Sequence, residues 1–290
     1  MEATDLIKKV RKIEIKTRGL SNHIFAGEYH SAFKGRGMTF SEVREYQYGD
    51  SIKQIDWNVT ARFNHPYVKI FEEERELTVI LLVDVSGSKF FGTNQQLKKD
   101  LIAEIAAVLS FSAIQNNDKI GVILFSDKVE KFIPPKKGKK HILRIITELL
   151  NFNPQSSGTN ITEALRYFTN AVKKKSTAFL ISDFIDNNYE QALSIANNKH
   201  DIIAVRIFDR REKELPNIGL VNMLDAETNK KLLIDTSNAN VRYKYKKWMQ
   251  NLENELNITV KKAGVDIISV ETGGDYIKPL LNLFKRRGAK

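Results

Sequence analysis

From residue 76 onward, short apolar runs alternate with longer segments whose apolar residues recur at helical spacing. The first run, "ELTVILLVDVS", is apolar at successive positions, which indicates a strand buried on both faces. Similar runs follow, namely "DKIGVILFSD", "TAFLISDF", "HDIIAVRIFD" and "VDIISVET", and "VEKFIPP" reads as an edge strand ended by prolines. This order predicts the α/β class, with a doubly wound, mostly parallel sheet flanked by helices.

Residues 1–75 follow a different pattern. Their first segment predicts an amphipathic helix with apolar residues at helical spacing: Leu6, Ile7, Val10 and Ile13. A glycine-punctuated, aromatic stretch follows, which predicts a small β-containing module packed against the main sheet. We therefore divide the chain into 1–75 and 76–290, and we read 211–236 as a hairpin excursion that can pack on the N-terminal module.

The N-terminal module contains a group of residues that could be either structural or functional. Asp56, Trp57 and Arg62 lie close together in the sequence. Because tryptophan is a large apolar anchor, we interpret the group as a buried Trp57 beside an Asp–Arg pair.

The composition excludes several classes of protein. Cysteine is absent, so disulfides and thiolate chemistry are excluded, which is typical of a reducing compartment. No apolar run reaches the roughly 18 to 20 residues that cross a bilayer, and the N-terminus does not resemble a secretion signal. We therefore expect a cytoplasmic protein, with any membrane link made through a partner.

The net charge of +11 raises the alternatives of a nucleic acid or an anionic membrane surface as partner. The densest basic groups are "KKGKKH" (136–141) and "FKRRGAK" (284–290). Runs of charge most often form a solvated surface, and we interpret these groups in that way. Binding to nucleic acid is thus an alternative hypothesis and not the preferred one.

Two aspartates end core strands of the predicted sheet. In doubly wound sheets the ligand site lies beyond the carboxyl ends of the strands, where the strand order reverses. Asp84 and Asp183 each stand at such an end, so both should face one crevice. Asp84 also opens a turn that contains Ser86 and Ser88. The plain alternative for this turn is capping of backbone amides at the strand end.

The turn does not match the common covalent enzymes. A phosphatase with an aspartyl nucleophile needs a second acid two residues on, where this chain has Ser86. A serine hydrolase elbow needs glycine two residues before and after the nucleophile, where this chain has Asp84 and Ser88. A phosphate-binding loop is also absent. We therefore predict a protein that is not an enzyme and has no small-molecule substrate.

A metal ion fits the turn better. Mg²⁺ takes about six oxygen ligands, and Mn²⁺ or Ca²⁺ are alternatives. Ser86 and Ser88 can direct their hydroxyls to one point, beside Asp84. Thr159 and Asp183 lie on other segments that can complete the shell. Hydroxyl ligands do not neutralise the ion, so it would still attract an acidic side chain from a protein ligand.

These five positions resemble the metal-ion-dependent adhesion site of von Willebrand factor A domains. The matching residues are Asp84, Ser86, Ser88, Thr159 and Asp183. The resemblance implies that the three hydroxyl residues bind the ion directly, while the two aspartates act largely through water. It also implies a von Willebrand factor A-like fold.

A second resemblance runs from roughly residue 20 to 288. The stretch from "GRGMTFSEVREYQYGD" to "LLVDVSGSKFFG" is similar to the bacterial family called domain of unknown function 58. The residues that carry the likeness are Gly37, Phe40, Arg44, Tyr46, Gly49, Asp50, Ile55, Asp56, Trp57, Ala61 and Arg62. The resemblance implies association with a MoxR-type AAA+ ATPase and a role in complex assembly, stress or aerotolerance.

Together these features predict a cation-dependent scaffold that recruits a protein ligand. Two alternatives from other classes stay open. One is a nucleic-acid-binding protein that uses the basic surface. The other, less favoured, is a metal-dependent hydrolase, which would need a positioned base that the motif does not offer.

Overall fold

The computed structural model describes residues 10–14, 17, 38–73, 76–87, 97–224 and 231–289. Its centre is a six-stranded sheet in the order β10-β7-β6-β3-β4-β5, in which every neighbouring pair is parallel except β4 with β5. The strands are β3 (Thr78–Asp84), β4 (Lys119–Phe125), β5 (Val129–Lys136), β6 (Thr177–Ser182), β7 (Asp201–Phe208) and β10 (Asp266–Glu271). The prediction of a doubly wound, mostly parallel α/β sheet is confirmed.

The strand order reverses beside β3. The chain first extends the sheet from β3 through β4 to β5, and then returns to β6 on the other side of β3. Every residue of β3 after Thr78 is buried, as its continuous apolar sequence predicts. The carboxyl ends of β3 and β6 are therefore adjacent at the switch point, where ligands bind in sheets of this kind.

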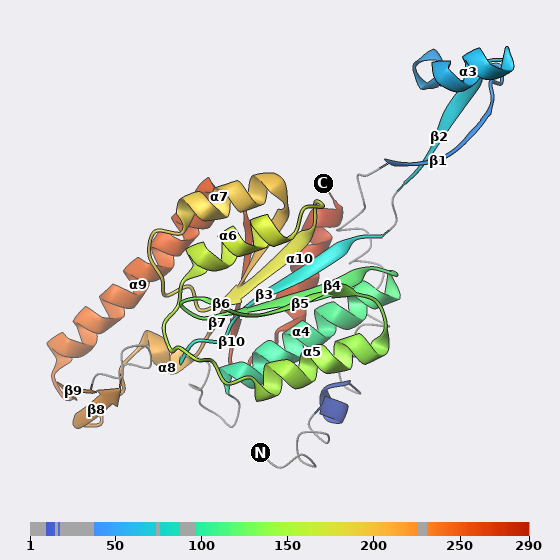
Figure 1. The fold of residues 1–290 in the computed structure, drawn as a ribbon. Coiled ribbons are helices and arrows are strands. Elements are labelled where there is room, and N and C mark those ends of the chain that lie inside the picture. Colours follow the sequence, from blue (N-terminus) through green and yellow to red (C-terminus); the bar gives the residue numbers. More distant parts are fainter. Residues whose placement is uncertain are drawn as a thin grey trace.

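Helices cover both faces of the sheet (Figure 1). One face packs against α4 (Lys98–Gln115), α5 (Lys139–Asn151) and α10 (Ile277–Gly288). The other packs against α6 (Ile161–Ala171), α7 (Glu190–Lys199) and α9 (Ala239–Lys262). Successive strand residues point to opposite faces, so Leu81 belongs to the first core and Leu82 to the second.

The N-terminal helix is described only in part. Residues 10–14 and 17 are helical, and Ile13 is buried in the core that contains α4. The other predicted apolar positions of this helix, Leu6 and Ile7, lie outside the described residues.

Residues 38–73 form an arm that extends away from the main sheet instead of packing against it (Figure 1). Its strands β1 (Met38–Glu45) and β2 (Tyr67–Glu73) pair with each other, Ile55 adds an isolated bridge to Val68, and the turn between the strands carries η2 (Ile52–Gln54) and α3 (Trp57–Phe63). The prediction of a buried tryptophan was wrong, because Trp57 is 67% exposed. The predicted Asp–Arg pair was also wrong, since Asp56 pairs with Lys69.

The excursion at 211–236 contains an antiparallel hairpin, β8 (Leu220–Leu224) with β9 (Lys231–Asp235). Figure 1 places this hairpin near the start of α9, at the opposite end of the molecule from the arm. Packing of the two hairpins on each other is therefore not seen. Among the described residues, no helix combines the length and the apolar character that a bilayer-spanning segment requires.

Candidate functional site

Three loops converge at the carboxyl edge of the sheet. The Gly87 amide donates a hydrogen bond of 2.9 Å to the Ser157 carbonyl, which joins the loop after β3 to the loop before α6. The Ile161 amide donates a bond of 2.7 Å to Asp186 Oδ2, which joins the start of α6 to the loop after β6. The structure thus brings together the loops that carry Asp84, Ser86, Thr159 and Asp183. Ser88 lies outside the described residues.

Asp84 is buried at the end of β3, with both carboxylate oxygens engaged by donors of the chain. Oδ1 accepts the Ser86 amide at 2.9 Å, and Oδ2 accepts the Ser182 hydroxyl at 2.7 Å. Ser182 Oγ in turn accepts the Phe184 amide at 3.0 Å. Ser182, at the end of β6, therefore links the two central strand ends.

The electrostatics of Asp84 favour a cation in the crevice. Burial, followed by the negative charge of Asp183, raises the pKa of the Asp84 carboxyl to about 7. A positive ion beside the Asp84 carboxylate would offset both its desolvation and the repulsion by the neighbouring negative charge. The donor set around them consists of hydroxyl and carboxylate oxygens, which hard divalent cations prefer.

The small number of acidic side chains near Asp84 also agrees with a metal site made mainly of hydroxyl ligands. No cluster of three or more His, Cys, Asp or Glu side chains with metal-binding geometry occurs in the part of the chain that the structure describes. A cage made of carboxylates is therefore absent there. Asp84, Ser86, Thr159 and Asp183 are the described residues that would hold the ion, and the ion would supply an electrophilic position for an outside oxygen ligand.

Thr159 lies just before α6, whose first turn is capped by the next residue. Asn160 is the N-cap of α6, and its side chain accepts the Glu163 amide at 2.9 Å. The Asn160 amide donates to the Ser126 carbonyl at 2.9 Å, which fixes the loop against the end of β4. Capping is thus performed by Asn160, and Thr159 is not needed for it.

Asp183 carries an ion pair that the sequence interpretation missed. Its Oδ2 lies 3.1 Å from the Lys98 ammonium, which also lies 2.6 Å from Glu212 Oε1. Burial alone would lower the pKa of Lys98, but the charges of Asp183 and then Glu212 outweigh it and raise the pKa above its ordinary value. Lys98 is therefore charged, although its side chain is only 2% exposed.

A sequence signal for Lys98 exists. It lies three and seven residues before Leu101 and Ile105, so it shares the apolar face of α4. A lysine in register with a buried helix face needs an acid partner inside the protein. Glu212 had no comparable signal, because its role depends on the position of α8 (Arg210–Lys213) in space.

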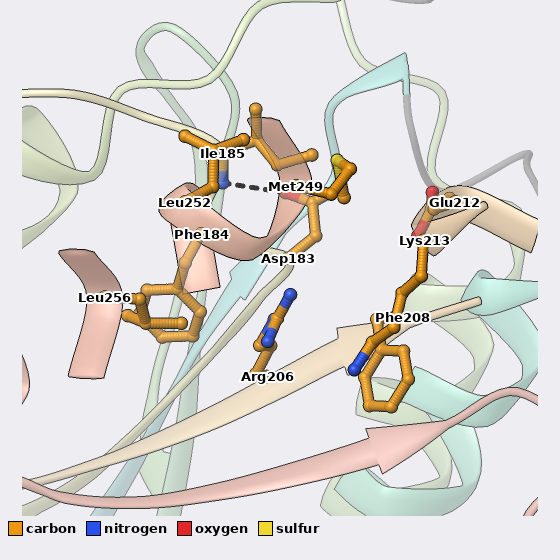
Figure 2. A pocket seen from close by; sticks show the side chains of 10 residues that line it. All are labelled: Asp183, Phe184, Ile185, Arg206, Phe208, Glu212, Lys213, Met249, Leu252 and Leu256. Atoms are coloured by element: carbon orange, nitrogen blue, oxygen red, sulfur yellow. Dashed lines mark hydrogen bonds between the residues drawn. The ribbon is translucent and has the colours of Figure 1, made fainter. Parts of the chain in front are cut away.

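Asp183 also lines a pocket (Figure 2). Its wall combines charged and apolar side chains from the ends of β6 and β7, from α8 and from α9: Asp183, Phe184, Ile185, Arg206, Phe208, Glu212, Lys213, Met249, Leu252 and Leu256. The dashed line in Figure 2 is the bond from the Ile185 amide to Asp183 Oδ1, at 3.3 Å. Both oxygens of Asp183 are therefore engaged within the chain.

The fold defines a doubly wound α/β domain, and the loops that meet at its switch point form a candidate ligand site. The family model described as "Protein of unknown function DUF58" matches residues 42–255. The chain belongs to this family.

Some relatives match almost the whole chain. An uncharacterised protein of Mycobacterium tuberculosis H37Rv is 26% identical over 291 aligned residues, which cover 98% of this chain and 91% of that protein. Among solved structures, an aerotolerance-related membrane protein from Bacteroides fragilis is similar, with a TM-score of 0.50, 13% identity, and coverage of 73% of this chain and 98% of that one. At this identity the likeness shows the fold alone.

A third similarity is to the VWA domain of SpRpn10. Its TM-score is 0.39, with 12% identity over 71% of this chain and 94% of that domain. This match is too distant to bear on function. The function of the chain must therefore be inferred from the residues of the crevice.

Proposed function

We propose that the protein is a non-enzymatic scaffold that binds a protein ligand through a divalent cation held in the crevice. The ion, Mg²⁺ or else Mn²⁺ or Ca²⁺, is held by the hydroxyls of Ser86, Ser88 and Thr159 and, through water, by Asp84 and Asp183. An acidic side chain of the protein ligand completes its shell. The preference for an adaptor over an enzyme is supported by the lack of a positioned base in the motif.

One observation carries the proposal. Burial first, and then the negative charge of Asp183, raises the pKa of Asp84 to about 7, and hydroxyl residues stand on the same loops. Such a crevice gains free energy when it takes up a cation, yet it offers too few charges to neutralise a divalent one. The remaining positive charge favours an outside carboxylate.

The partner belongs to the same proposal. A MoxR-type AAA+ ATPase is the partner that the family resemblance implies, and assembly or stress response is the implied setting. The aerotolerance-related description of the Bacteroides fragilis protein agrees with this setting. The acidic ligand and the ATPase can be the same protein or two different ones, and partner capture distinguishes these two cases.

The test is capture of partners by the purified full chain with Mg²⁺ and with EDTA, read by mass spectrometry. We expect partners that EDTA releases, and we expect Ser86→Ala and Asp183→Ala to lose the same partners while their circular dichroism stays native. Thr162→Val is the matched control, because the Thr162 hydroxyl bonds to the Asn188 carbonyl at 3.3 Å and belongs to none of the proposed ligands. Capture that is unchanged by EDTA and by both variants would refute the proposal.

A further inference from the structure

A buried ion pair joins Asp183 to the start of α4. Lys98 is the first residue of α4, and its ammonium is buried between two acids, 3.1 Å from Asp183 Oδ2 and 2.6 Å from Glu212 Oε1. A cation at the start of a helix is disfavoured by the helix dipole, and burial adds a large desolvation cost. Asp183 and Glu212 are the acids that offset both costs.

The position of Lys98 bears on any cation in the crevice. A fixed positive charge in contact with Asp183 shares the charge of that carboxylate and repels a second cation. In the buried crevice this repulsion is screened less than at the surface. Lys98 therefore lowers the affinity of the site for a divalent ion.

Glu212 is the second acid that pairs with Lys98. Its Oε1 pairs with Lys98, while its Oε2 accepts the Asp209 amide at 2.9 Å in the capping box of α8. The Glu212 carbonyl also accepts the hydroxyl of Tyr245 from α9, at 2.9 Å. The Asp209 amide thus fixes the carboxylate of Glu212, Tyr245 fixes its backbone, and the charge of the carboxylate compensates the ammonium.

We propose that Lys98 and Glu212 are positioning residues that set the cation affinity of the crevice, with Lys98 lowering it and Glu212 restoring part of it. The inference rests on the proposed function, because it concerns the same metal site. It adds that α8 and α9, which hold Glu212, reach this site through one buried lysine. A displacement of Glu212 away from Lys98 would lower the affinity of the site for the ion.

The experiment measures Mn²⁺ binding to the metal-free, full-length protein by isothermal titration calorimetry. We expect Lys98→Met to bind Mn²⁺ on the order of tenfold more tightly, because a charge of like sign is gone. We expect Glu212→Gln to bind it several-fold more weakly, because the lysine loses its counter-charge. The double variant K98M/E212Q should fall between Lys98→Met and the wild type.

Two further variants make the series interpretable. Lys128→Met is the matched control, since Lys128 is an exposed lysine that bonds to Gln155 at 2.9 Å, in the loop before α6. Solvent screens its charge, and we expect less than a twofold change. If Lys98→Met is too unstable to study, K98M/E212Q, which leaves no unpaired Glu212, carries the test: it must still bind Mn²⁺ more tightly than the wild type.

The sign of the change separates the outcomes. Weaker binding in folded Lys98→Met would mean that the lysine only holds Asp183 in place, and equal affinities across the series would mean that it has no role; either result overturns the inference. Ser86→Ala tests the site itself in the same titration. If Ser86→Ala weakens binding but the predicted order is missing, this inference alone fails, whereas a wild type that binds no Mn²⁺ removes the proposed function as well.

Discussion

The main sheet and the arm of residues 38–73 are stabilised in different ways. Strands β3 and β6 are buried along almost their whole length between two layers of helices. In the arm, Val68 is the only buried side chain among those described between 42 and 70. Aromatic and aliphatic side chains stay exposed there instead, namely Tyr48, Ile52, Trp57 and Phe63. The sheet depends on burial, and the arm depends on local hydrogen bonds.

The same contrast holds for charges. The sheet edge buries Asp84, Asp183 and Lys98, so that each charge depends on its partners. The arm pairs its charges near solvent: Arg44 donates two bonds to Asp50, at 2.9 and 2.8 Å, while 36% of its side chain is exposed. Single substitutions should therefore be far more costly in the sheet than in the arm, and the size of this difference can be measured.

The largest difference is expected for apolar truncations. Phe179→Ala, at the centre of β6, removes a fully buried ring and should lower the free energy of unfolding by about 3 to 5 kcal/mol. Ile52→Ala, at a side chain that is 69% exposed in the arm, should change it by less than about 0.5 kcal/mol. Urea denaturation followed by circular dichroism measures both. Similar losses for the two variants would show that the arm is covered in the folded protein.

The second prediction compares two lysines. Lys98→Ala leaves Asp183 and Glu212 buried without their cation and should destabilise the metal-free protein by about 3 kcal/mol. Lys69→Ala breaks an exposed pair with Asp56, whose atoms are 3.4 Å apart, and should cost less than about 1 kcal/mol. Thermal melts in EDTA report both values. A small loss for Lys98→Ala would mean that water enters the crevice and screens the acids.

The contrast between sheet and arm also explains how much of the structure could be predicted from sequence. The sheet was predictable because strands buried on both faces are apolar without interruption, as in "TVILLVD", and because parallel strands place their ends on one edge. That rule alone placed Asp84 and Asp183 at one crevice.

The arm and the ion pair were not predictable by the same rules. Trp57 was expected in a core because tryptophan is usually buried, but no sequence pattern states whether a hairpin lies against its own domain. Lys98 joins Asp183 and Glu212 across 85 and 114 positions of the chain, so the bridge depends on tertiary packing. A sequence pattern shows which face of a helix or strand is apolar. The exposure of Trp57 and the ion pairs of Lys98 depend instead on which helices and strands contact each other in the folded protein.

The third prediction concerns the stability of the protein at acidic pH. It depends on a histidine of the main domain and involves no residue of the arm. His200 is 1% exposed, neither of its ring nitrogens has a hydrogen-bond partner in the described part of the chain, and its ring centroid lies 4.3 Å from that of Phe168. Burial, with the positive charge of Lys199, lowers the pKa of His200 to about 4. The His200 imidazole of the unfolded chain, with an ordinary pKa near 6.5, therefore binds a proton first, and the contribution of His200 to stability falls as the pH drops from about 6.5 to 4.

The expected size follows from that shift. Between pH 7 and pH 5, this histidine alone should lower the free energy of unfolding by about 2 kcal/mol. Urea denaturation at several pH values measures the slope, and His200→Phe, which keeps a ring against Phe168, should remove this part of it. An identical slope in His200→Phe would show that the neutral histidine is not the origin of the acid sensitivity.

The smallest effect is expected at the cap of the arm helix. Asp56 Oδ1 accepts the amides of Asn58 and Val59, at 3.0 and 3.3 Å, at the start of α3. Asp56→Ala removes this cap and should destabilise α3 by about 1 kcal/mol, while Asp56→Asn keeps an acceptor and should cost less than half as much. Amide hydrogen exchange in 58–64 should accelerate by about fivefold in the alanine variant.

This small effect is informative because it should be confined to the arm. Because the strand pairing described for the arm stays within residues 38–73, the loss of the Asp56 cap should leave the main unfolding transition unchanged. If Asp56→Ala instead lowers the melting temperature of the whole protein, then the arm and the sheet unfold together, and the exposed Trp57 and Phe63 must be covered by contacts that join the two regions. The contrast between a buried sheet and a locally stabilised arm would then no longer hold.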